Sequence, residues 1–351
     1  MMTAQPPLLS YPFQPPEPRT SLEVAPGVYW IRLPLPFKLD HINVWAIDDG
    51  DGWVLVDTGL NSPQAVADWL ALMAEGPLAR PLKGVYATHM HPDHLGLAGW
   101  FTRRAGVPLS MSRTEYLTCR VLHADTSREA PPEAVQFYRQ AGWPEAALET
   151  YRSRFGGFGK FIHALPDVYR RLQDGQRLDW GGRQWRVIVT AGHSPEHVSL
   201  YCAELDVLIA GDQVLPRISS NVSVYPNEPQ ANPLQDWFDS LDKMAREVPD
   251  TALVLPAHNE PFHGLHARLE QLRRSQERAL ARLLEQLAAQ PLRIVDSFTA
   301  LFGRPISLDD ASQLGLATGE AMACMNYLLA QGQVRREVDG AGVAWYAARE
   351  D

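Results

Sequence analysis

Short runs of apolar residues, separated by turns, divide much of the chain into predicted strands. Residues 28–33, 42–47 and 53–56 form a predicted meander, with a polar turn at 48–52. Further strands are predicted at 83–88, 185–190, 198–201, 207–210 and 253–257. Ser62 and Pro63 are typical of a helix start and predict a helix over 64–74, and another is predicted over 95–105. This mixture predicts an α+β domain.

Residues 111–171 interrupt the strand pattern with helical stretches, including 132–140 and 145–155. The segment is rich in arginine and aromatic residues, and residues 155–160 combine flexible glycines with rings and a cation. One interpretation is a lid whose arginines meet an anionic substrate group. The alternative is a helical subdomain with solvated charges, because lids and ordinary insertions have similar compositions.

The last third of the chain has a different periodicity. A leucine stripe predicts a connecting helix over 264–290, which Pro291 ends. Helices are then predicted at 294–302, 307–314 and 318–330, and a hairpin at 334–338 and 343–347. Three helices and a hairpin are similar to a winged-helix domain. The predicted organisation is a proline-rich arm at 1–24, a main domain at 25–265 and a helix with a winged-helix-like domain at 266–351.

Composition narrows the class of protein. A chain of 351 residues is long enough for one large and one smaller domain. Its formal charge of −9, from 32 basic and 41 acidic residues, gives no general attraction to nucleic acid or anionic membrane. Cys119, Cys202 and Cys324 lack paired spacing, as in reduced intracellular proteins. No stretch approaches the roughly 18 apolar residues of a membrane span. We therefore expect a cytoplasmic enzyme with no membrane partner.

Residues 88–96 concentrate the chemistry of the chain. His89, His91, Asp93 and His94 follow directly after a predicted strand. Imidazole nitrogen and carboxylate oxygen are ligands of zinc and similar cations, and a tight turn can aim several of them at one point. A pH-sensitive surface patch is the alternative for such a cluster alone.

Three distant residues favour the metal site. His193, Asp212 and His258 each lie one to three residues beyond a predicted apolar strand. Open sheets place their chemistry at such edges, so we expect these side chains to join the cluster.

In their order, these motifs resemble those of the metallo-β-lactamase superfamily, and the likeness extends over roughly residues 25–265, from Asp57 to His258. The resemblance implies an αββα sandwich with a binuclear centre. It implies that the first metal is held by His89, His91 and His193, the second by Asp93, His94 and His258, and both by a bridging Asp212. Asp57 would support the centre from behind.

The chemistry of such a centre is consistent with hydrolysis. Two divalent ions, Zn²⁺ or alternatively Fe or Mn, would acidify water so that a bridging hydroxide attacks a carbonyl or phosphorus centre. Asp93 and Asp212 are the candidate catalytic residues. The predicted substrate is a small ester, a lactone or a thioester of the acyl-CoA or glutathione type, since the chain resembles glyoxalase II. The alternatives are a mononuclear iron sulfur dioxygenase, a ribonuclease or phosphodiesterase, and a metal-bound scaffold without turnover.

The charge of the C-terminal domain argues against nucleic-acid binding. Residues 306–334 contain no lysine or arginine, whereas phosphate contacts supply most non-specific affinity. We expect this domain to mediate packing, homodimerisation or one wall of the substrate pocket. Other candidates around the centre are His197 and His263 as supporting residues, with His41 ranked with His263, and Arg217 and Tyr225 as substrate contacts.

Overall fold

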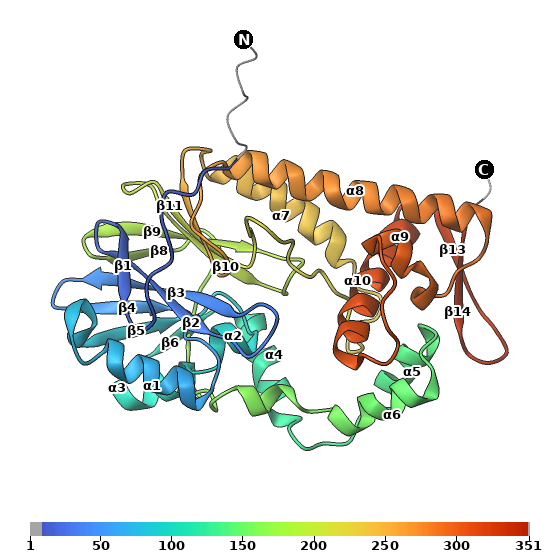
Figure 1. Cartoon of the computed structure of the whole chain (residues 1–351), viewed down its shortest axis with the longest axis horizontal. Helices are drawn as coiled ribbons and strands as arrows, with labels where there is room; N and C mark the ends of the chain where they lie inside the picture. The colour runs from blue at the N-terminus through green and yellow to red at the C-terminus, as the bar shows by residue number, and fades with distance from the viewer. Residues whose placement is uncertain (1–8, 350–351) are drawn as a thin grey trace, which may run out of the picture.

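Two packed β-sheets form the centre of the computed structural model, which describes residues 9–349 (Figure 1). The first sheet has the strand order β1-β2-β3-β4-β5-β6-β7. Its strands are β1 (Ser21–Ala25), β2 (Val28–Pro34), β3 (His41–Asp49), β4 (Gly52–Val56), β5 (Leu82–Tyr86), β6 (Leu109–Met111) and β7 (Arg170–Arg171). The second has the order β12-β11-β10-β9-β8. Its strands are β8 (Arg177–Trp180), β9 (Arg183–Thr190), β10 (His197–Cys202), β11 (Val207–Gly211) and β12 (Leu253–Pro256).

Both sheets are mixed. Strands β1 to β4 are antiparallel and β4 to β7 are parallel, while in the second sheet only the β11–β12 pair is parallel. Alternating side chains of β2 serve two cores: Trp30 packs between the sheets, and Ile31 faces the outer helices. Trp30 lies opposite Trp45 of β3, and Trp185 of the second sheet joins the same inter-sheet core.

Helices cover the outer faces of the sheets, which confirms the αββα sandwich. The first sheet is covered by α1 (Pro63–Leu72) and α3 (Ala98–Ala105), which share its outer core. The second is covered by α7 (Pro233–Glu247) and by the start of α8 (Leu265–Ala289), seen above it in Figure 1. Short helical turns are α2 (Pro92–Leu95) and the 3-10 segments Gly76–Ala79, Phe158–Phe161 and Ile294–Ser297.

The insert and the C-terminal domain lie on the same side of the sandwich (Figure 1). The insert contains α4 (Arg113–Ala124), α5 (Pro132–Gln140) and α6 (Glu145–Arg154). The C-terminal domain contains α9 (Phe298–Phe302), α10 (Ala311–Ala330), β13 (Val334–Val338) and β14 (Ala344–Ala348). Trp143 of the insert donates its indole N–H to Thr318 Oγ1 of α10 at 2.9 Å. The two parts are therefore in direct contact.

Helix α8 carries the C-terminal domain. It begins after Gly264, whose φ of 101° is in the left-handed region, and it runs for 25 residues. Midway along it, Gln276 Nε2 lies 3.2 Å from Cys324 Sγ of α10. None of the described helices is long and apolar enough to cross a membrane.

Several elements differ from the sequence-based expectations. Strand β1 begins at Ser21, inside the segment predicted as the arm, and residues 1–8 of that arm lie outside the described residues. The helices predicted at 307–314 and 318–330 are one helix that begins only at Ala311, because Asp310 caps its start and Gly315 is tolerated inside it. The winged-helix interpretation stays a prediction beside the observed helices and hairpin.

Candidate metal centre

The cluster at 89–94 occupies the loop that follows β5 and the turn α2. Pro92 is the first residue of α2, where its missing N–H and fixed φ fit a helix start. The turn places His94 on the buried side and leaves Asp93 partly exposed. The local sequence therefore separates the cluster into side chains that point to two neighbouring positions.

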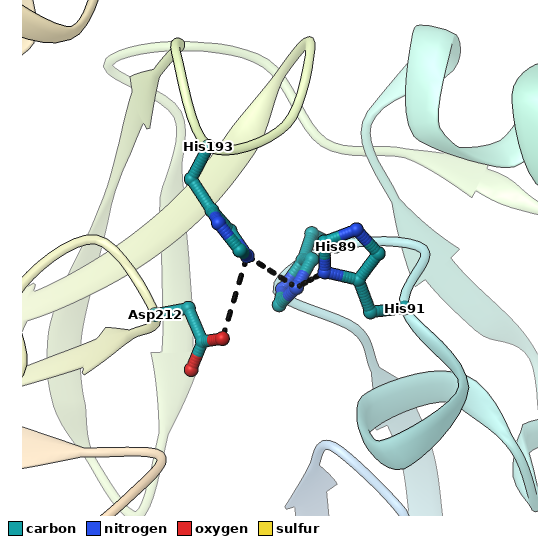
Figure 2. A group of neighbouring side chains, drawn as sticks. All are labelled: His89, His91, His193 and Asp212. Carbon is teal, nitrogen blue, oxygen red and sulfur yellow. Dashed lines mark hydrogen bonds and ion pairs between the residues drawn. The ribbon is translucent and has the colours of Figure 1, made fainter. Parts of the chain in front are cut away.

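A first ligand group consists of His89, His91, His193 and Asp212. His89 Nε2 lies 2.8 Å from His91 Nδ1 and 3.2 Å from His193 Nε2. Asp212 Oδ2 lies 3.4 Å from His193 Nε2. Figure 2 shows these side chains pointing toward one another from three separate loops.

A second ligand group consists of Asp93, His94 and His258. Asp93 Oδ2 is 3.4 Å from His258 Nε2 and 3.8 Å from His94 Nε2. His258 follows β12, and β12 pairs in parallel with β11, the strand that ends beside Asp212. Parallel pairing brings the two strand ends to the same edge of the second sheet.

Asp212 lies between the two groups. Its Oδ2 faces His193 of the first group, whereas its Oδ1 lies 3.5 Å from His94 Nε2 and 3.4 Å from His258 Nε2 of the second. One carboxylate thus presents one oxygen to each group. An anionic bridge of this kind offsets the repulsion between two neighbouring cations.

Fixed acceptors behind the histidines set their tautomers. His94 Nδ1 lies 2.7 Å from Asp57 Oδ2, His193 Nδ1 lies 2.8 Å from the Asn221 carbonyl oxygen, and His258 Nδ1 lies 2.8 Å from that of His41. Each Nδ1–H therefore donates away from the centre, which leaves Nε2 directed into it. Such outer hydrogen bonds orient metal-binding imidazoles.

Asp57 is itself held by Thr88. Its carboxylate accepts hydrogen bonds from the Thr88 N–H and Oγ1–H, both at 2.8 Å. The backbone of Asp57 has a φ of 61°, in the left-handed region that is uncommon for a residue with a side chain. Asp57 thus lies directly behind His94, and its supporting role stays a prediction.

The histidines of the centre differ in the direction in which their pKa values are shifted. Burial lowers the pKa of His89 well below its usual value and that of His91 to about 3, so both are neutral and able to donate a lone pair. Burial also opposes the charge of His94, but Asp212, Asp57 and Asp93 outweigh it and raise the His94 pKa. His94 and His258 in turn outweigh burial at Asp93 and lower its pKa to about 2.

The side chains fit a pair of divalent cations. Two buried atoms at the centre, His94 Nε2 and Asp212 Oδ1, have no hydrogen-bond partner among the described residues. Buried polar atoms are normally paired, so these two mark a position where a ligand is expected. Three imidazoles with one carboxylate, and two imidazoles with two carboxylates when Asp212 is shared, are donor sets that zinc accepts.

Glu115 holds the first ligand group and was missed in the sequence. The side chain is fully buried at the start of α4, and burial raises its pKa. Its carboxylate accepts hydrogen bonds from the N–H of Met90 at 2.9 Å and of Glu196 at 2.8 Å. It thereby joins the loop of His89 and His91 to the loop of His193. Ser112 and Glu115 have the spacing of a helix capping box, so their sequence signal indicates only a helix start.

Asn43 supports the opposite side of the centre. Its Nδ2 donates to the carbonyl oxygens of Pro256 at 2.9 Å and of Asn259 at 2.6 Å, on either side of His258. His41 Nε2 accepts the N–H of Asn259 at 2.8 Å. A single buried asparagine within a strand gave no sequence signal for this role.

The other predicted site residues have different positions. His197 is buried behind the centre, where its Nε2 accepts the N–H of Asp212 at 3.1 Å. His263 lies apart from both ligand groups, with Nδ1 3.2 Å from the Thr251 carbonyl oxygen. Arg217 is exposed, pairs with Glu260 at 3.0 Å and lies over the ring of Tyr11. Tyr225 is partly exposed in the loop between β11 and α7. The structure thus brings His197, but not His263, to the ligand groups.

Four of the eight arginines of the insert pair with acidic neighbours. Arg152 contacts Glu145 and Glu149, each at 2.9 Å, and Arg128 contacts Asp125 at 2.8 Å. Arg154 instead lines a cavity of about 200 Å³ with Trp143, Tyr151 and Ala311 of α10.

Gly96 allows the ligand loop to pack closely. A Cβ at this position would lie 2.5 Å from the Asn61 nitrogen and 2.6 Å from the Gly59 oxygen. We expect Gly96→Ala to lower the free energy of unfolding by about 1–3 kcal/mol and to reduce metal uptake, because the loop must move. Urea unfolding and metal analysis measure both effects. Gly315→Ala is the control, since nothing lies near its Cβ and alanine favours the helix. Equal stability of the two variants would contradict the prediction.

Comparison with protein families gives two matches. Residues 38–258 match the model described as metallo-beta-lactamase superfamily. Residues 280–349 match the model described as metallo-beta-lactamase-like, C-terminal domain. Together the two models cover the strand-rich part with both ligand groups and the smaller C-terminal domain.

Two solved structures resemble nearly the whole chain. A beta-lactamase domain protein from Burkholderia ambifaria is 37% identical with a TM-score of 0.88, and the match covers 97% of this chain and 98% of that one. A metallo-beta-lactamase family protein from Thermus thermophilus is 27% identical with a TM-score of 0.77, covering 93% and 100%.

Curated relatives are more distant. The acyl-coenzyme A thioesterase MBLAC2 of Gallus gallus is 26% identical over 67% of this chain and 79% of its own length. The atrochrysone carboxyl ACP thioesterase of Aspergillus fumigatus is 24% identical over 67% of this chain and 41% of its own. The lactamase-like protein nscB of the same species is 23% identical, and the chain spans 61% of its length.

Proposed function

This chain belongs to the metallo-β-lactamase superfamily, and we propose that it is a two-metal hydrolase that cleaves thioesters of the acyl-CoA type. The observation that carries the proposal is the placement of Asp212, whose two oxygens face two separate ligand groups. Two complete groups support a binuclear hydrolase over a mononuclear iron dioxygenase.

Divalent cations bound there would acidify water to a pKa near 7 and polarise the thioester carbonyl. Residues of this chain position the atoms that this step requires. His94, His193 and His258 keep their Nε2 atoms directed inward through their Nδ1 hydrogen bonds. Asp93, the partly exposed carboxylate of the second group, is placed to orient the attacking water or to relay its proton.

The class of substrate is suggested by the relatives. Two of them are named as thioesterases, one acting on acyl-coenzyme A and one on an acyl carrier protein. Their identity to this chain is 26% and 24%, which supports a class of reaction and not a particular acyl group. A nuclease is less well supported, because α10 carries no lysine or arginine that could contact phosphates.

Hydrolysis of a panel of acyl-CoA and glutathione thioesters by the zinc-loaded protein tests the proposal. We expect thiol release from at least one thioester, and its loss in His91→Ala, which removes a ligand of the first group. His263→Ala is the matched control and should retain full turnover, because His263 contacts the Thr251 carbonyl away from the centre. No turnover of any thioester by the loaded protein would contradict the proposal and favour lactones or phosphodiesters.

A further inference from the structure

One backbone carbonyl orients the ligand His193. The acceptor for His193 Nδ1 is the oxygen of Asn221, at 2.8 Å. Asn221 belongs to residues 212–232, the long connection between β11 and α7, which we call the crossover loop. At Asn221 the loop has no strand or helix of its own to fix it. The direction of that carbonyl therefore depends on contacts of the loop with other parts of the chain.

The side chain of Asn221 is held from the C-terminal domain. Its Nδ2 donates to Glu320 Oε2 of α10 at 3.1 Å, and its Oδ1 accepts a hydrogen bond from Ser223. Both ends of the amide are thus engaged, which fixes the orientation of the whole residue. Burial raises the pKa of Glu320 to about 7, and the hydrogen bond from Asn221 opposes this increase.

Helix α10 packs closely against the same part of the loop. The Val224 N–H donates to the Gly319 carbonyl oxygen at 3.0 Å. A Cβ on Gly319 would lie 2.7 Å from the Cβ of Ser223, so only glycine permits this approach. Farther along, Asn326 Nδ2 donates to the carbonyl oxygens of Pro229 at 3.0 Å and of Ala231 at 2.8 Å. The helix therefore contacts the loop at two separate places.

The second ligand group has no such dependence on α10. His94 is oriented by Asp57 at the end of β4, and His258 by the backbone of His41 at the start of β3. Both supports belong to the first sheet, inside the αββα sandwich. The C-terminal domain thus supports the first ligand group through Asn221, whereas the second ligand group is supported from within the sandwich.

We propose that Glu320 is a positioning residue that, through Asn221, sets the affinity of the first ligand group for its metal. The inference rests on the metal binding in the proposed function, and it assigns to the C-terminal domain the task of completing that group. Hydrogen bonds that orient metal ligands from outside commonly change metal affinity by about 10–100-fold when removed.

Two backgrounds isolate the ligand groups. His258→Ala leaves only the first group complete, and His91→Ala leaves only the second. Zinc affinity is measured in each by competition with a chelator at pH 8, where Glu320 is ionised. We expect Glu320→Met to lower affinity about 10-fold or more in the His258→Ala background and less than about twofold in the His91→Ala background. Glu320→Gln, which keeps an oxygen for Asn221, should restore most of the loss.

Asn326→Leu is the matched control. It removes two hydrogen bonds between α10 and the crossover loop, but not the one at Asn221. It should leave both zinc affinities within about twofold, since effects of well-separated sites are usually independent. Equal loss in the two backgrounds with Glu320→Met, or no loss in either, would overturn the inference.

A second measurement needs no metal. In the metal-free protein labelled with ¹⁵N-histidine, the Nδ1–H signal of His193, assigned with His193→Gln, reports its hydrogen bond to Asn221. Glu320→Met should shift this signal toward a mixture of tautomers, and Asn326→Leu should preserve it. If the wild-type chain took up no metal, the proposed function would fail, and an unchanged His193 signal in Glu320→Met would separately overturn this inference.

Discussion

Replacing Asp212 with asparagine should reduce thioester turnover at least about 1000-fold, because the bridge loses its charge while keeping its shape. The carboxylate faces His193 with one oxygen and His94 and His258 with the other. A neutral amide at this position cannot offset the repulsion between two cations. We therefore expect the variant to retain its fold and to hold fewer than two metals.

Turnover, bound metal per chain and circular dichroism of Asp212→Asn provide the measurement. Asp239→Asn is the control: it removes an aspartate charge from the exposed face of α7, where Asp239 accepts a hydrogen bond from Gln235 of the same helix. It should match the wild-type chain in all three quantities. Two tightly bound metals together with normal turnover in Asp212→Asn would show that the centre needs no charged bridge at Asp212, and would contradict the prediction.

Glu115→Ala should lower both stability and the affinity of the first ligand group. The substitution leaves the N–H groups of Met90 and Glu196 buried without their acceptor. Each of the two groups costs about 1–3 kcal/mol, so we expect the free energy of unfolding to fall by about 2–6 kcal/mol. Because the same two loops carry His91 and His193, zinc affinity should fall about 10–100-fold.

Urea unfolding of the metal-free protein and chelator competition measure these losses. Glu133→Ala is a matched control, since Glu133 also lies in the first turn of a helix, α5, but is exposed. It loses the same interaction with the helix dipole without uncovering buried amides. If both variants unfolded within about 0.5 kcal/mol of the wild-type chain, Glu115 would not join the two loops as described.

The candidate metal ligands could be predicted because each is tied to local sequence. Four of them lie in one turn after β5, and His193, Asp212 and His258 each follow the end of a strand. Strand ends collect at an edge of a sheet whatever the details of packing, so the seven side chains could be expected together before their distances were known.

Residues that support the ligands escaped prediction for a physical reason. Glu115 and Asn43 act through hydrogen bonds to backbone groups 25 and 213 residues away. Backbone groups are the same at every position, so the sequence gives no sign of which ones a side chain will meet. Helix α7 was a different omission, because Asn232 and Pro233 do carry the signal of a helix start.

The helix boundaries predicted in the C-terminal domain differ from the observed ones. The sequence predicted two helices, at 307–314 and 318–330, but one helix continues through Gly315 because the surrounding alanines and leucines favour helix and nothing crowds the position. Because α10 is continuous, Thr318, Glu320 and Asn326 lie on one rigid helix. Thr318 contacts the insert, whereas Glu320 and Asn326 contact two separate parts of the crossover loop.

The length of α8 makes the metal centre sensitive to small tilts of this helix. Gln276, where α8 contacts α10, lies about 18 Å along the helix from its start beside Gly264, at 1.5 Å per residue. A tilt of about 5° at that glycine would displace α10 by about 1.5 Å, which exceeds the tolerance of a hydrogen bond such as that of Asn221 to Glu320. Loss of a metal from the first ligand group would then report how firmly the C-terminal domain packs against the sandwich.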